Sequence, residues 1–224
     1  MLLTFKVIDF HCHTFFSDGV LGPSELAQRA RLLGYSVLGI TDHADFSNLS
    51  SLISKAKLAA ESLGNVFPGF RVLPGVELTH VPPSQIPDLI AKARDLGAFP
   101  VIVHGETPVE PVEPGTNLMA IQGKADILAH PGFLSVEEAC LAQTNGVYLE
   151  ISARAGHSLT NGWVVKVAQQ AGAKVVINSD THAPEDLLTP LFQEKVGLGA
   201  GLTPEEFRQA LGNAQELADK FLGL

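Results

Sequence analysis

The sequence contains little cysteine, and this scarcity limits the classes of protein to which it can belong. Cys12 and Cys140 are the two cysteines among 224 residues. Two thiols are too few for a disulfide framework or for a zinc cluster held by thiolates. We therefore expect a cytoplasmic protein with free thiols, in which Cys12 is buried and chemically inert.

Positive charge is also scarce. The chain has 15 Lys and Arg against 24 Asp and Glu, a formal net charge of −9, and its basic residues form no run. Nucleic-acid surfaces depend on clustered Lys and Arg, so no extended nucleic-acid partner is expected. A small anionic substrate is compatible with this composition if its counter-charge is concentrated at one place.

Long apolar runs and targeting signals are absent as well. No stretch approaches the roughly 20 uninterrupted apolar residues of a membrane span, so no membrane association is expected. The N-terminus has no basic region and no small-residue cleavage site, so Met1–Ile8 is interpreted as a buried first strand rather than a signal peptide. Neither GxGxxG nor a P-loop follows a predicted strand, which argues against nucleotide binding.

Apolar runs alternate with segments of helical periodicity along the chain. The strand-like runs are Phe5–Phe10, Val37–Ile40, Arg71–Leu78, Phe99–Val103, Ala125–Ala129, Gly146–Ile151 and Lys174–Asn178. The helical segments are Pro23–Leu33, Leu52–Leu63, Ser84–Leu96, Ser135–Gln143 and Asn161–Ala171. This alternation predicts an α/β fold, a parallel sheet covered by helices, in a single domain over residues 1–224. The number of units suits a closed or nearly closed barrel, but periodicity leaves a doubly wound open sheet as an alternative.

Two segments lack periodicity. His104–Asn117 is rich in Pro and Glu, and a long irregular loop at a strand end is often functional. Phe192–Leu202 is also expected to be irregular. A last helix is expected to begin at Thr203 and to run toward Leu211.

The positions of the histidines carry the functional signal. The eight are His11, His13, His43, His80, His104, His130, His157 and His182. All of them end or follow predicted strands, and so do the carboxylates Glu77, Glu150 and Asp180. In a parallel barrel the carboxyl ends of the strands converge on one face, where active sites are built. The sequence therefore places imidazoles and carboxylates around one cavity.

Each of these residues alone has an ordinary explanation. An isolated histidine at a strand end is usually a hydrogen-bonded structural group, Asp18 suits a turn, and Asp42 suits a helix cap. Many neutral imidazoles crowded together without a metal, however, would leave polar atoms unsatisfied and would repel one another once protonated. We therefore predict metal binding. Imidazole and carboxylate without thiolate favour Zn²⁺, Mn²⁺ or Fe²⁺, and the supply of donor atoms requires two or three ions.

The order of the motifs resembles a known family. The motifs are D-x-H-x-H-T-x-x-S-D-G at Asp9–Gly19, T-D-H at Thr41–His43, G-V-E at Gly75–Glu77, H-P at His130–Pro131 and S-D-T-H at Ser179–His182. They resemble the PHP family, named for polymerase and histidinol phosphatase domains, and within it the stand-alone histidinol-phosphatase type. This resemblance implies a distorted (β/α)7 barrel, similar to a TIM barrel, with a trinuclear metal site.

The resemblance also assigns the ligands by position. The first ion would be held by His11, His13, Glu77 and Asp180, the second by Glu77, His104 and His130, and the third by Asp18, His43 and His182. Asp18 stands where other members have a histidine. This departure favours Mn²⁺ or Fe²⁺ at the third site.

Three further residues are expected in the catalytic machinery. Arg154 follows a predicted strand, and a bidentate guanidinium suits phosphate, so Arg154 is expected to bind the substrate phosphate; an outward salt bridge is the alternative. His157 is expected as a phosphate ligand or a proton donor. Asp9 shares a strand face with His11 and is expected to orient an imidazole. His80 is expected at the rim or behind the ligands.

The predicted function is the hydrolysis of a phosphoester by a metal-activated water. The resemblance suggests a small phosphomonoester, such as histidinol phosphate, as the substrate. The alternatives are a phosphodiesterase or 3′–5′ exonuclease acting on short nucleic acid, a metal-dependent amidohydrolase, and a non-enzymatic domain whose metal is structural or regulatory. The oligomeric state is left open.

Overall fold

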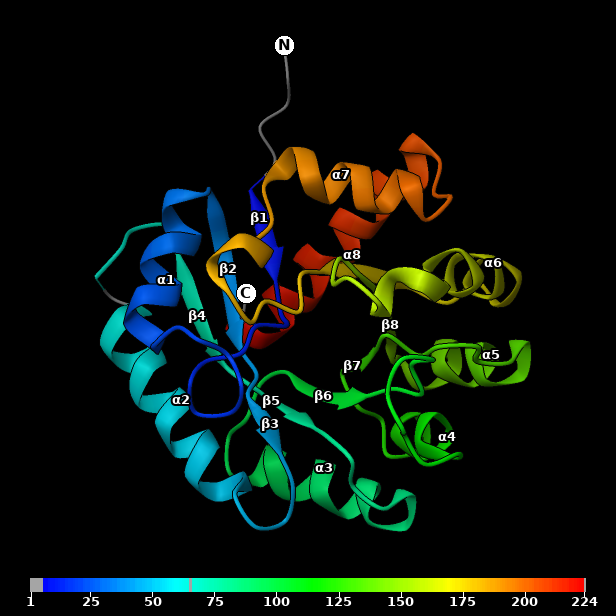
Figure 1. Cartoon of the computed structure of the whole chain (residues 1–224), viewed down its shortest axis with the longest axis horizontal. Helices are drawn as coiled ribbons and strands as arrows, with labels where there is room; N and C mark the ends of the chain where they lie inside the picture. The colour runs from blue at the N-terminus through cyan, green and yellow to red at the C-terminus, as the bar shows by residue number, and fades with distance from the viewer. Residues whose placement is uncertain (1–5, 65, 224) are drawn as a thin grey trace.

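Short parallel strands lie at the centre of this computed structural model, which describes residues 6–64 and 66–223 (Figure 1). The strands are β1 (Val7–Asp9), β2 (Tyr35–Ile40), β3 (His43–Ala44), β4 (Arg71–Pro74), β5 (Val76–Leu78), β6 (Val101–His104), β7 (Ile127–Ala129), β8 (Tyr148–Ser152) and β9 (Val175–Asn178). One sheet has the order β1-β2-β4, the other has the order β3-β5-β6-β7-β8-β9, and every neighbouring pair is parallel. The predicted α/β fold with parallel strands is therefore confirmed.

Helices surround the strands on the outside of the molecule (Figure 1). They are α1 (Pro23–Leu32), α2 (Leu49–Gly64), α3 (Ile86–Asp95), α4 (Thr116–Gln122), α5 (Val136–Asn145), α6 (Asn161–Ala171), α7 (Pro190–Gly199) and α8 (Pro204–Leu222), with short 3₁₀ turns at Pro83–Gln85, His157–Thr160 and Pro184–Asp186. Local sequence sets several of their ends. Ser135 and Glu138 form a reciprocal capping box at the start of α5, and Thr203 and Glu206 form another at the start of α8.

The division into two sheets arises where the third predicted run is interrupted. This run, Arg71–Leu78, is divided into β4 and β5 at Gly75. A Cβ atom at Gly75 would lie 2.6 Å from Cγ2 of Thr41 and 2.7 Å from the carbonyl oxygen of Pro100. Only glycine permits this close approach, so the kink between β4 and β5 is encoded at this position.

The outer strands of the two sheets also meet. Cys12 and Thr181, which follow β1 and β9, form an isolated parallel bridge. The amide of His13 donates to the carbonyl oxygen of Thr181 (2.8 Å), and the amide of Thr181 donates to the carbonyl oxygen of His11 (3.3 Å). These bonds hold the segment after β1 against the segment after β9. Residues 170 positions apart in the chain can therefore contribute to one site.

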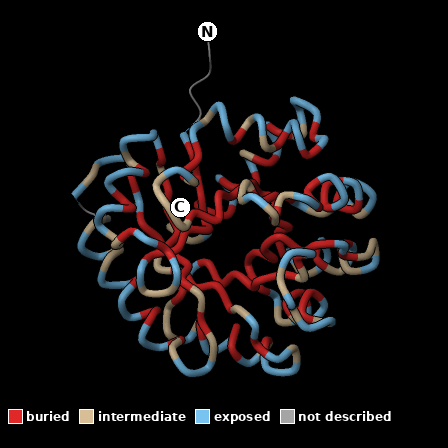
Figure 2. Tube along the Cα trace, in the orientation of Figure 1, coloured by how far each residue is buried: buried red, intermediate tan, exposed pale blue. Residues whose placement is uncertain are grey.

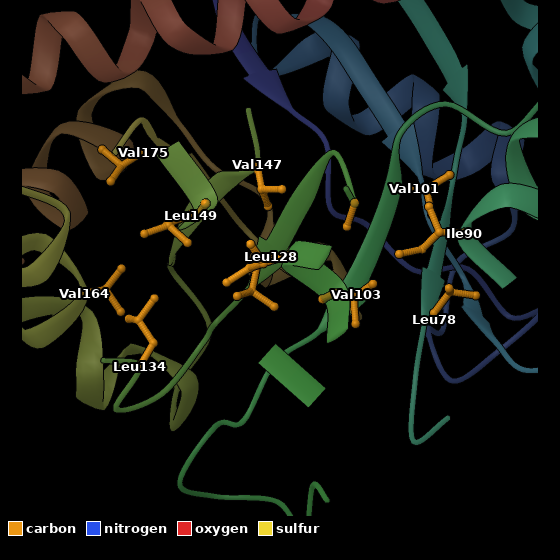
Figure 3. Close-up of a cluster of buried hydrophobic side chains, with 14 of the residues drawn as sticks. Leu78, Ile90, Val101, Val103, Leu128, Leu134, Val147, Leu149, Val164 and Val175 are labelled. Carbon is orange, nitrogen blue, oxygen red and sulfur yellow. The ribbon is translucent and has the colours of Figure 1, made fainter. Parts of the chain in front are cut away.

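The apolar core lies on both faces of the strands. One cluster contains Leu78, Val103, Leu128 and Leu149 from the strands together with side chains of the surrounding helices, such as Ile90 (Figure 3). Another joins strand residues to α8, with Ile8, Phe10, Val37, Ile102 and Val176 packed with Ala214, Leu217 and Ala218. Burial is concentrated at the centre and on the inner sides of the helices (Figure 2). Each fully buried Leu or Ile stabilises the fold by roughly 1.5–3 kcal/mol.

Helix α8 lies at the amino ends of the strands. The Asn213 side chain donates to the carbonyl oxygen of Val175, the first residue of β9 (2.9 Å). Lys174, just before β9, binds both carboxylate oxygens of Glu216 at 2.6 and 2.7 Å. With α8 at the amino ends, the opposite, carboxyl ends are left for the histidines.

The structure differs from the sequence-based prediction at several boundaries. Phe192–Leu202 is not irregular, because α7 spans Pro190–Gly199. The last helix continues past Leu211 to Leu222, and α4 begins at Thr116 within the predicted loop. The expected start of the first strand at Phe5 lies outside the described residues. Within residues 6–64 and 66–223, no helix combines the length and apolarity needed to span a bilayer.

Candidate metal centre

Side chains at the carboxyl ends of the strands converge on one centre. His11 and His13 follow β1, His43 begins β3, Glu77 lies in β5, His104 ends β6, His130 follows β7, and Asp180 and His182 follow β9. Asp18 comes from the turn between β1 and α1. Their donor atoms form overlapping groups, and within each group the atoms lie within 4.8 Å of one another. The structure thus brings together every residue that the sequence singled out as a metal ligand.

The first group consists of two imidazoles and two carboxylates. Nε2 of His11 lies 3.3 Å from Oε1 of Glu77 and 3.6 Å from Oδ1 of Asp180. Nε2 of His13 lies 3.2 Å from the same Asp180 oxygen and 3.6 Å from Oε2 of Glu77. All four residues are buried. This donor set is the one expected for the first ion, and it suits Zn²⁺, Mn²⁺ or Fe²⁺.

A second group surrounds Asp18. Oδ2 of Asp18 lies 3.1 Å from Nε2 of His182, and Oδ1 lies 3.4 Å from Nε2 of His43. The turn that carries Asp18 is held in place, because the amide of Val20 donates to the carbonyl oxygen of His182 (2.8 Å). Asp18, His43 and His182 therefore meet as expected for the third ion, with His13 as a further neighbour.

The group around His104 differs from the expected one. His104 is grouped with His130 and His157, whereas Glu77 is grouped with His11 and His130. Nε2 of His130 lies 3.6 Å from Oε1 of Glu77, so His130 links the two groups. His157, which the sequence analysis assigned to substrate, thus lies among the candidate ligands.

Unsatisfied polar atoms test whether this centre fits metal ions. Within the described part of the chain, the buried side-chain nitrogen and oxygen atoms that have no hydrogen-bond partner are His11 Nε2, His13 Nδ1 and Nε2, Glu77 Oε1, His130 Nδ1 and Glu150 Oε1. Leaving a buried polar atom unpaired costs about 1–3 kcal/mol. All of these atoms belong to one cluster of imidazoles and carboxylates. Divalent cations would satisfy those on His11, His13 and Glu77, which belong to the metal-ligand groups, so the residues present fit a metal centre.

Backbone conformation at the centre is also unusual. Asp180, His130 and His80 have φ values of 56°, 27° and 52°, in the left-handed region that residues with a side chain rarely adopt. Each such residue costs of order 1–3 kcal/mol, and conformations of this kind concentrate at functional sites. Asp180 and His130 both offer donor atoms to the groups described above. Among the described residues, the remaining non-glycine residue with a positive φ is Lys124 (59°), which follows α4, so three of the four such positions lie at the centre or its rim.

The pKa values of the clustered groups are strongly displaced. Burial alone would lower the pKa of His11, but Glu150, Glu77 and Asp180 raise it well above its ordinary value. Burial alone would raise the pKa of Glu77, but the histidines around it hold that pKa well below its ordinary range. The carboxylates are therefore ionised at neutral pH and offer negative charge to cations.

Comparisons with known proteins agree with this geometry. The model of the PHP domain family matches residues 9–103. A protein of Methanocaldococcus jannaschii, named uncharacterized protein MJ1295, is 53% identical over 204 residues, which are 91% of this chain and 94% of that protein. The chain belongs to the PHP domain family.

Two other similarities bear on this PHP domain protein. Ribonuclease P protein component 3 of Methanosarcina mazei is 28% identical over 219 residues, 91% of this chain and 84% of that protein. The crystal structure of histidinol phosphate phosphatase from Lactococcus lactis, complexed with zinc, L-histidinol and phosphate, has a TM-score of 0.55. The match covers 95% of this chain and 94% of that chain at 12% identity. The two proteins are similar in fold, and the fold of the histidinol phosphate phosphatase is TIM-barrel-like.

Glu150 is a residue of the centre that the sequence analysis left without a role. Its Oε2 lies 2.8 Å from Nδ1 of His11, and both side chains are buried. The same oxygen accepts a hydrogen bond from the side chain of Asn178 (2.9 Å). A carboxylate on Nδ1 fixes the ring so that Nε2 faces the centre. The sequence signal that could have indicated this role is the position of Glu150 at the end of the sixth predicted strand, since the other site residues also lie at strand ends.

Asp9 contacts backbone amides and a tyrosine hydroxyl, and not the imidazole that it was expected to orient. Its Oδ1 accepts from the amides of His11 (3.2 Å) and Ser179 (3.2 Å), and its Oδ2 accepts from the hydroxyl of Tyr35 (3.0 Å). Asp9 therefore holds the backbones after β1 and β9 together instead of orienting an imidazole. Glu150, from β8, takes the orienting role because its Oε2 lies 2.8 Å from Nδ1 of His11.

Asp42 fixes the turn that leads to Asp18. Its carboxylate accepts from the amide of Thr14 (2.8 Å), from the hydroxyl of Thr14 (2.8 Å) and from the hydroxyl of Ser17 (2.7 Å). Asp42 itself is buried at the end of β2. This network gives the exposed Asp18 a defined position beside His43 and His182.

Arg154 lies at the edge of the centre. Its Nη1 donates to Nδ1 of His182 (2.8 Å), and its Nε lies 3.8 Å from Oδ2 of Asp180. Nδ1 of His182 also lies 2.9 Å from the carbonyl oxygen of Asp180. An arginine always donates, so Nδ1 of His182 can accept from Arg154 or donate to Asp180, but not both at once. Arg154 thus faces the centre, and its Nη1 also lies 3.9 Å from Oδ2 of the partly exposed Asp186, so the alternative ion pair accompanies the inward contacts.

His157, His80 and Glu110 form the last part of the site. Nδ1 of His157 lies 2.8 Å from Oγ1 of Thr107, and Nε2 lies 3.8 Å from Oδ2 of Asp180. Glu110, from the Pro- and Glu-rich loop, lies 3.6 Å from Nε2 of the rim residue His80. The sequence predicted that this loop is functional, but it did not show which of the loop's glutamates would contact the site. Only the fold distinguishes Glu110, which turns inward.

Proposed function

We propose that this PHP domain protein hydrolyses a small phosphomonoester with the help of two or three divalent ions, Zn²⁺, Mn²⁺ or Fe²⁺. The observation that carries this proposal is the set of unsatisfied buried donor atoms on His11, His13 and Glu77 next to an inward-facing Arg154. An acidic chain, with a net charge of −9, would otherwise repel a phosphate dianion. A cation centre beside a guanidinium reverses the sign of the charge at this one place.

The candidate ligands would divide among the ions by their groups. His11, His13, Glu77 and Asp180 would hold the first, His104 and His130 with Glu77 nearby would hold the second, and Asp18, His43 and His182 would hold the third. When bound, such ions supply Lewis-acid charge to phosphoryl oxygens and lower the pKa of a water molecule. No serine or cysteine nucleophile is required.

The protein's own donors would bind and orient the phosphate. The guanidinium of Arg154 and the imidazole of His157 each lie 3.8 Å from the same atom, Oδ2 of Asp180. A phosphate oxygen beside Asp180 would meet both donors from different sides. The planar guanidinium would neutralise and orient the phosphate through two parallel hydrogen bonds. His157 would hold a proton at Nε2 for the departing oxygen while Thr107 contacts Nδ1.

A phosphodiesterase acting on short nucleic acid is the second candidate. The observation in its favour is the 28% identity with ribonuclease P protein component 3 over 91% of this chain. The lack of a basic run in this sequence weighs against a long nucleic-acid ligand. A monoester and a diester differ by one negative charge, so Arg154 would contribute more to binding of the monoester dianion.

The deciding experiment compares two chromogenic esters. Protein stripped of metal and reconstituted with Mn²⁺ or Zn²⁺ is assayed with p-nitrophenyl phosphate and with bis-p-nitrophenyl phosphate. We expect faster release of p-nitrophenol from the monoester, loss of turnover with a chelator, and recovery when the metal is restored. Asp180→Asn is expected to be inactive at every metal concentration, since it removes a charged donor from the first group.

Three results would change the conclusion. Faster turnover of the diester would favour the phosphodiesterase. Inactivity on both esters and on a panel of phosphorylated metabolites, with metal bound and the melting temperature raised, would favour a structural or regulatory metal. Activity that survives complete metal removal would contradict the proposed chemistry altogether.

A further inference from the structure

The carboxylate of Glu110 reaches into the metal centre from the loop that follows β6. Oε2 of Glu110 lies 3.1 Å from Nε2 of His104, and Oε1 lies 3.4 Å from Nε2 of His157. The side chain is 38% exposed, so it lies at the mouth of the centre with its carboxylate directed inward. Two of the three histidines in the group around His104 thus face this one carboxylate.

The loop over residues 105–115 is held at its base. Oε1 of Glu106 accepts from the amides of Gly115 (3.0 Å) and Asn117 (2.9 Å). The side chain of Asn117 in turn accepts from the amide of Glu106 (3.0 Å) and donates to the carbonyl oxygen of Pro131 (2.8 Å). These bonds join the two ends of the loop to each other and to the segment after His130. The position of Glu110 is therefore determined by the fold.

The contact between Glu110 and His104 requires a positive charge. Nδ1 of His104 lies 3.1 Å from the carbonyl oxygen of Gly105, which can only accept a hydrogen bond. Nδ1 therefore carries a proton, and Nε2 of the neutral ring carries a lone pair. This lone pair faces a carboxylate oxygen at 3.1 Å. Nε2 of His104 and Oε2 of Glu110 would repel each other at this distance unless a proton or a metal cation lay between them.

The composition of this group favours a metal cation. His104, His130 and His157 together contain no carboxylate, while the other groups each contain an acidic residue. Because Glu77 is shared with the first ion, a divalent ion held by His104 and His130 would keep part of its charge uncompensated in a buried place, which is costly. Glu110 is the acidic residue within contact distance of both His104 and His157 in the described structure.

We propose that Glu110 is a ligand of the ion held by His104 and His130, a carboxylate delivered to the centre by the loop 105–115. One oxygen, Oε2, binds the ion beside His104, and the other, Oε1, accepts from Nε2 of His157 while no substrate is bound. This ion would thereby be bound by three segments: the end of β6, the residue after β7, and the loop that follows β6. This inference rests on the metal centre of the proposed function, but it does not depend on phosphoester hydrolysis.

The test measures metal binding and not activity. The full chain is stripped of metal, titrated with Zn²⁺ in a calorimeter, and analysed for bound metal after dialysis against a weak chelator. Glu110→Gln is compared with Glu113→Gln, an exposed acid on the same loop, and with Glu110→Asp. Cobalt substitution adds a spectroscopic readout, since the visible bands of Co²⁺ respond to the loss of a carboxylate ligand.

We expect the dissociation constant of the most weakly bound Zn²⁺ to be at least about tenfold higher in Glu110→Gln than in wild type, or that ion to be lost on dialysis. Glu110→Asp is expected to bind more tightly than Glu110→Gln, and Glu113→Gln is expected to match wild type in metal content and Co²⁺ spectrum. Circular dichroism checks that each variant is folded.

Equal metal content, affinity and Co²⁺ spectrum in Glu110→Gln and wild type would overturn the proposal. Turnover that rises in Glu110→Gln with unchanged metal would also overturn it, because Glu110 would then compete with the substrate and not bind the ion. Wild-type protein that binds metal but hydrolyses no phosphoester would contradict the proposed function and leave the Glu110 measurement valid.

Discussion

Nδ1 of His11 lies 2.8 Å from Oε2 of Glu150, and neither side chain is exposed to solvent. The contact joins the segment after β1 to β8, which are 139 positions apart in the chain. It fixes the His11 ring so that the opposite nitrogen, Nε2, lies 3.3 Å from Glu77. The orientation of a central candidate ligand thus depends on a residue that offers no donor to any of the metal-ligand groups.

We predict that Glu150→Gln weakens metal binding about 10- to 100-fold without abolishing the fold. Glutamine keeps an oxygen that can accept from Nδ1 of His11, but it lacks the charge that makes the imidazole a stronger donor. Competition with a chelator measures the affinity. Glu137→Gln, in the first turn of α5, is the matched control. Unchanged affinity in Glu150→Gln would show that the contact does not tune the metal.

Arg154→Ala is expected to weaken inhibition by inorganic phosphate by about tenfold or more, because a charged hydrogen-bond donor to the phosphate is lost. Metal content is expected to stay the same, because Arg154 offers no metal-binding atom. Arg154→Lys restores the charge but not the bidentate geometry, so it should recover only part of the affinity. Arg208→Ala, on α8 at the opposite end, is the control. Identical phosphate inhibition in Arg154→Ala and wild type would remove Arg154 from the substrate site.

Metal binding is expected to release protons, so the affinity should rise with pH. Burial alone would lower the pKa of His43, but Glu77 and Asp18 raise it to about 10. At neutral pH the metal-free ring is therefore protonated, and this proton must leave before a cation binds. Calorimetric titration in two buffers with different ionisation enthalpies counts the protons released. Equal apparent enthalpies in both buffers would contradict the prediction.

The same shift predicts how the metal-free protein responds to pH. The pKa of His43 is about 10 in the folded protein and about 6.5 in the unfolded chain. The protonated ring therefore stabilises the fold fully below about pH 6.5, and this contribution is lost as the pH rises through about 10. The melting temperature of the metal-free form should therefore fall between about pH 7 and pH 10, and His43→Gln should reduce this slope. The metal-loaded form should change less over the same range. A slope that is identical in His43→Gln and wild type would disprove the assignment to His43.

Gly132→Ala is expected to destabilise the metal-free protein by about 2–3 kcal/mol. A Cβ atom at Gly132 would lie 1.9 Å from the carbonyl oxygen of Glu106, and φ at this position is 64°. The clash is with backbone at the base of the loop 105–115, which has no room to yield. Chemical denaturation measures the change in the free energy of unfolding.

The control for Gly132→Ala has the opposite expected sign. Gly212 lies within α8, and a Cβ atom there would meet no other atom within 4 Å. Gly212→Ala should stabilise the protein by about 0.5–1 kcal/mol, since alanine favours the helix. If both variants destabilised the protein equally, the close approach at Gly132 would not be the cause.

Much of the fold was predictable because its signals are local. The alternation of apolar runs and helical segments arises because the central strands are buried under the surrounding helices. The strands β6 to β9 coincide closely with their predicted runs. The helix α7 was missed because its stability comes from distant contacts. Gln193 donates to the carbonyl oxygen of Ile177 (3.2 Å), and Gly197 lies close to Phe207. No periodicity in Phe192–Leu202 reveals such partners.

By itself the sequence determined that this is an acidic α/β protein whose histidines and acids follow the strands. These properties depend on the order of residues along single segments, and the ordered motifs from Asp9 to His182 were sufficient to indicate the PHP family. Tertiary structure alone decided that Glu150 and not Asp9 orients His11, that His157 joins His104 and His130, and that Glu110 turns inward. Each of these is a contact between segments far apart in the chain. Its geometry depends on how the strands are arranged around the centre, and no local pattern of residues encodes that arrangement.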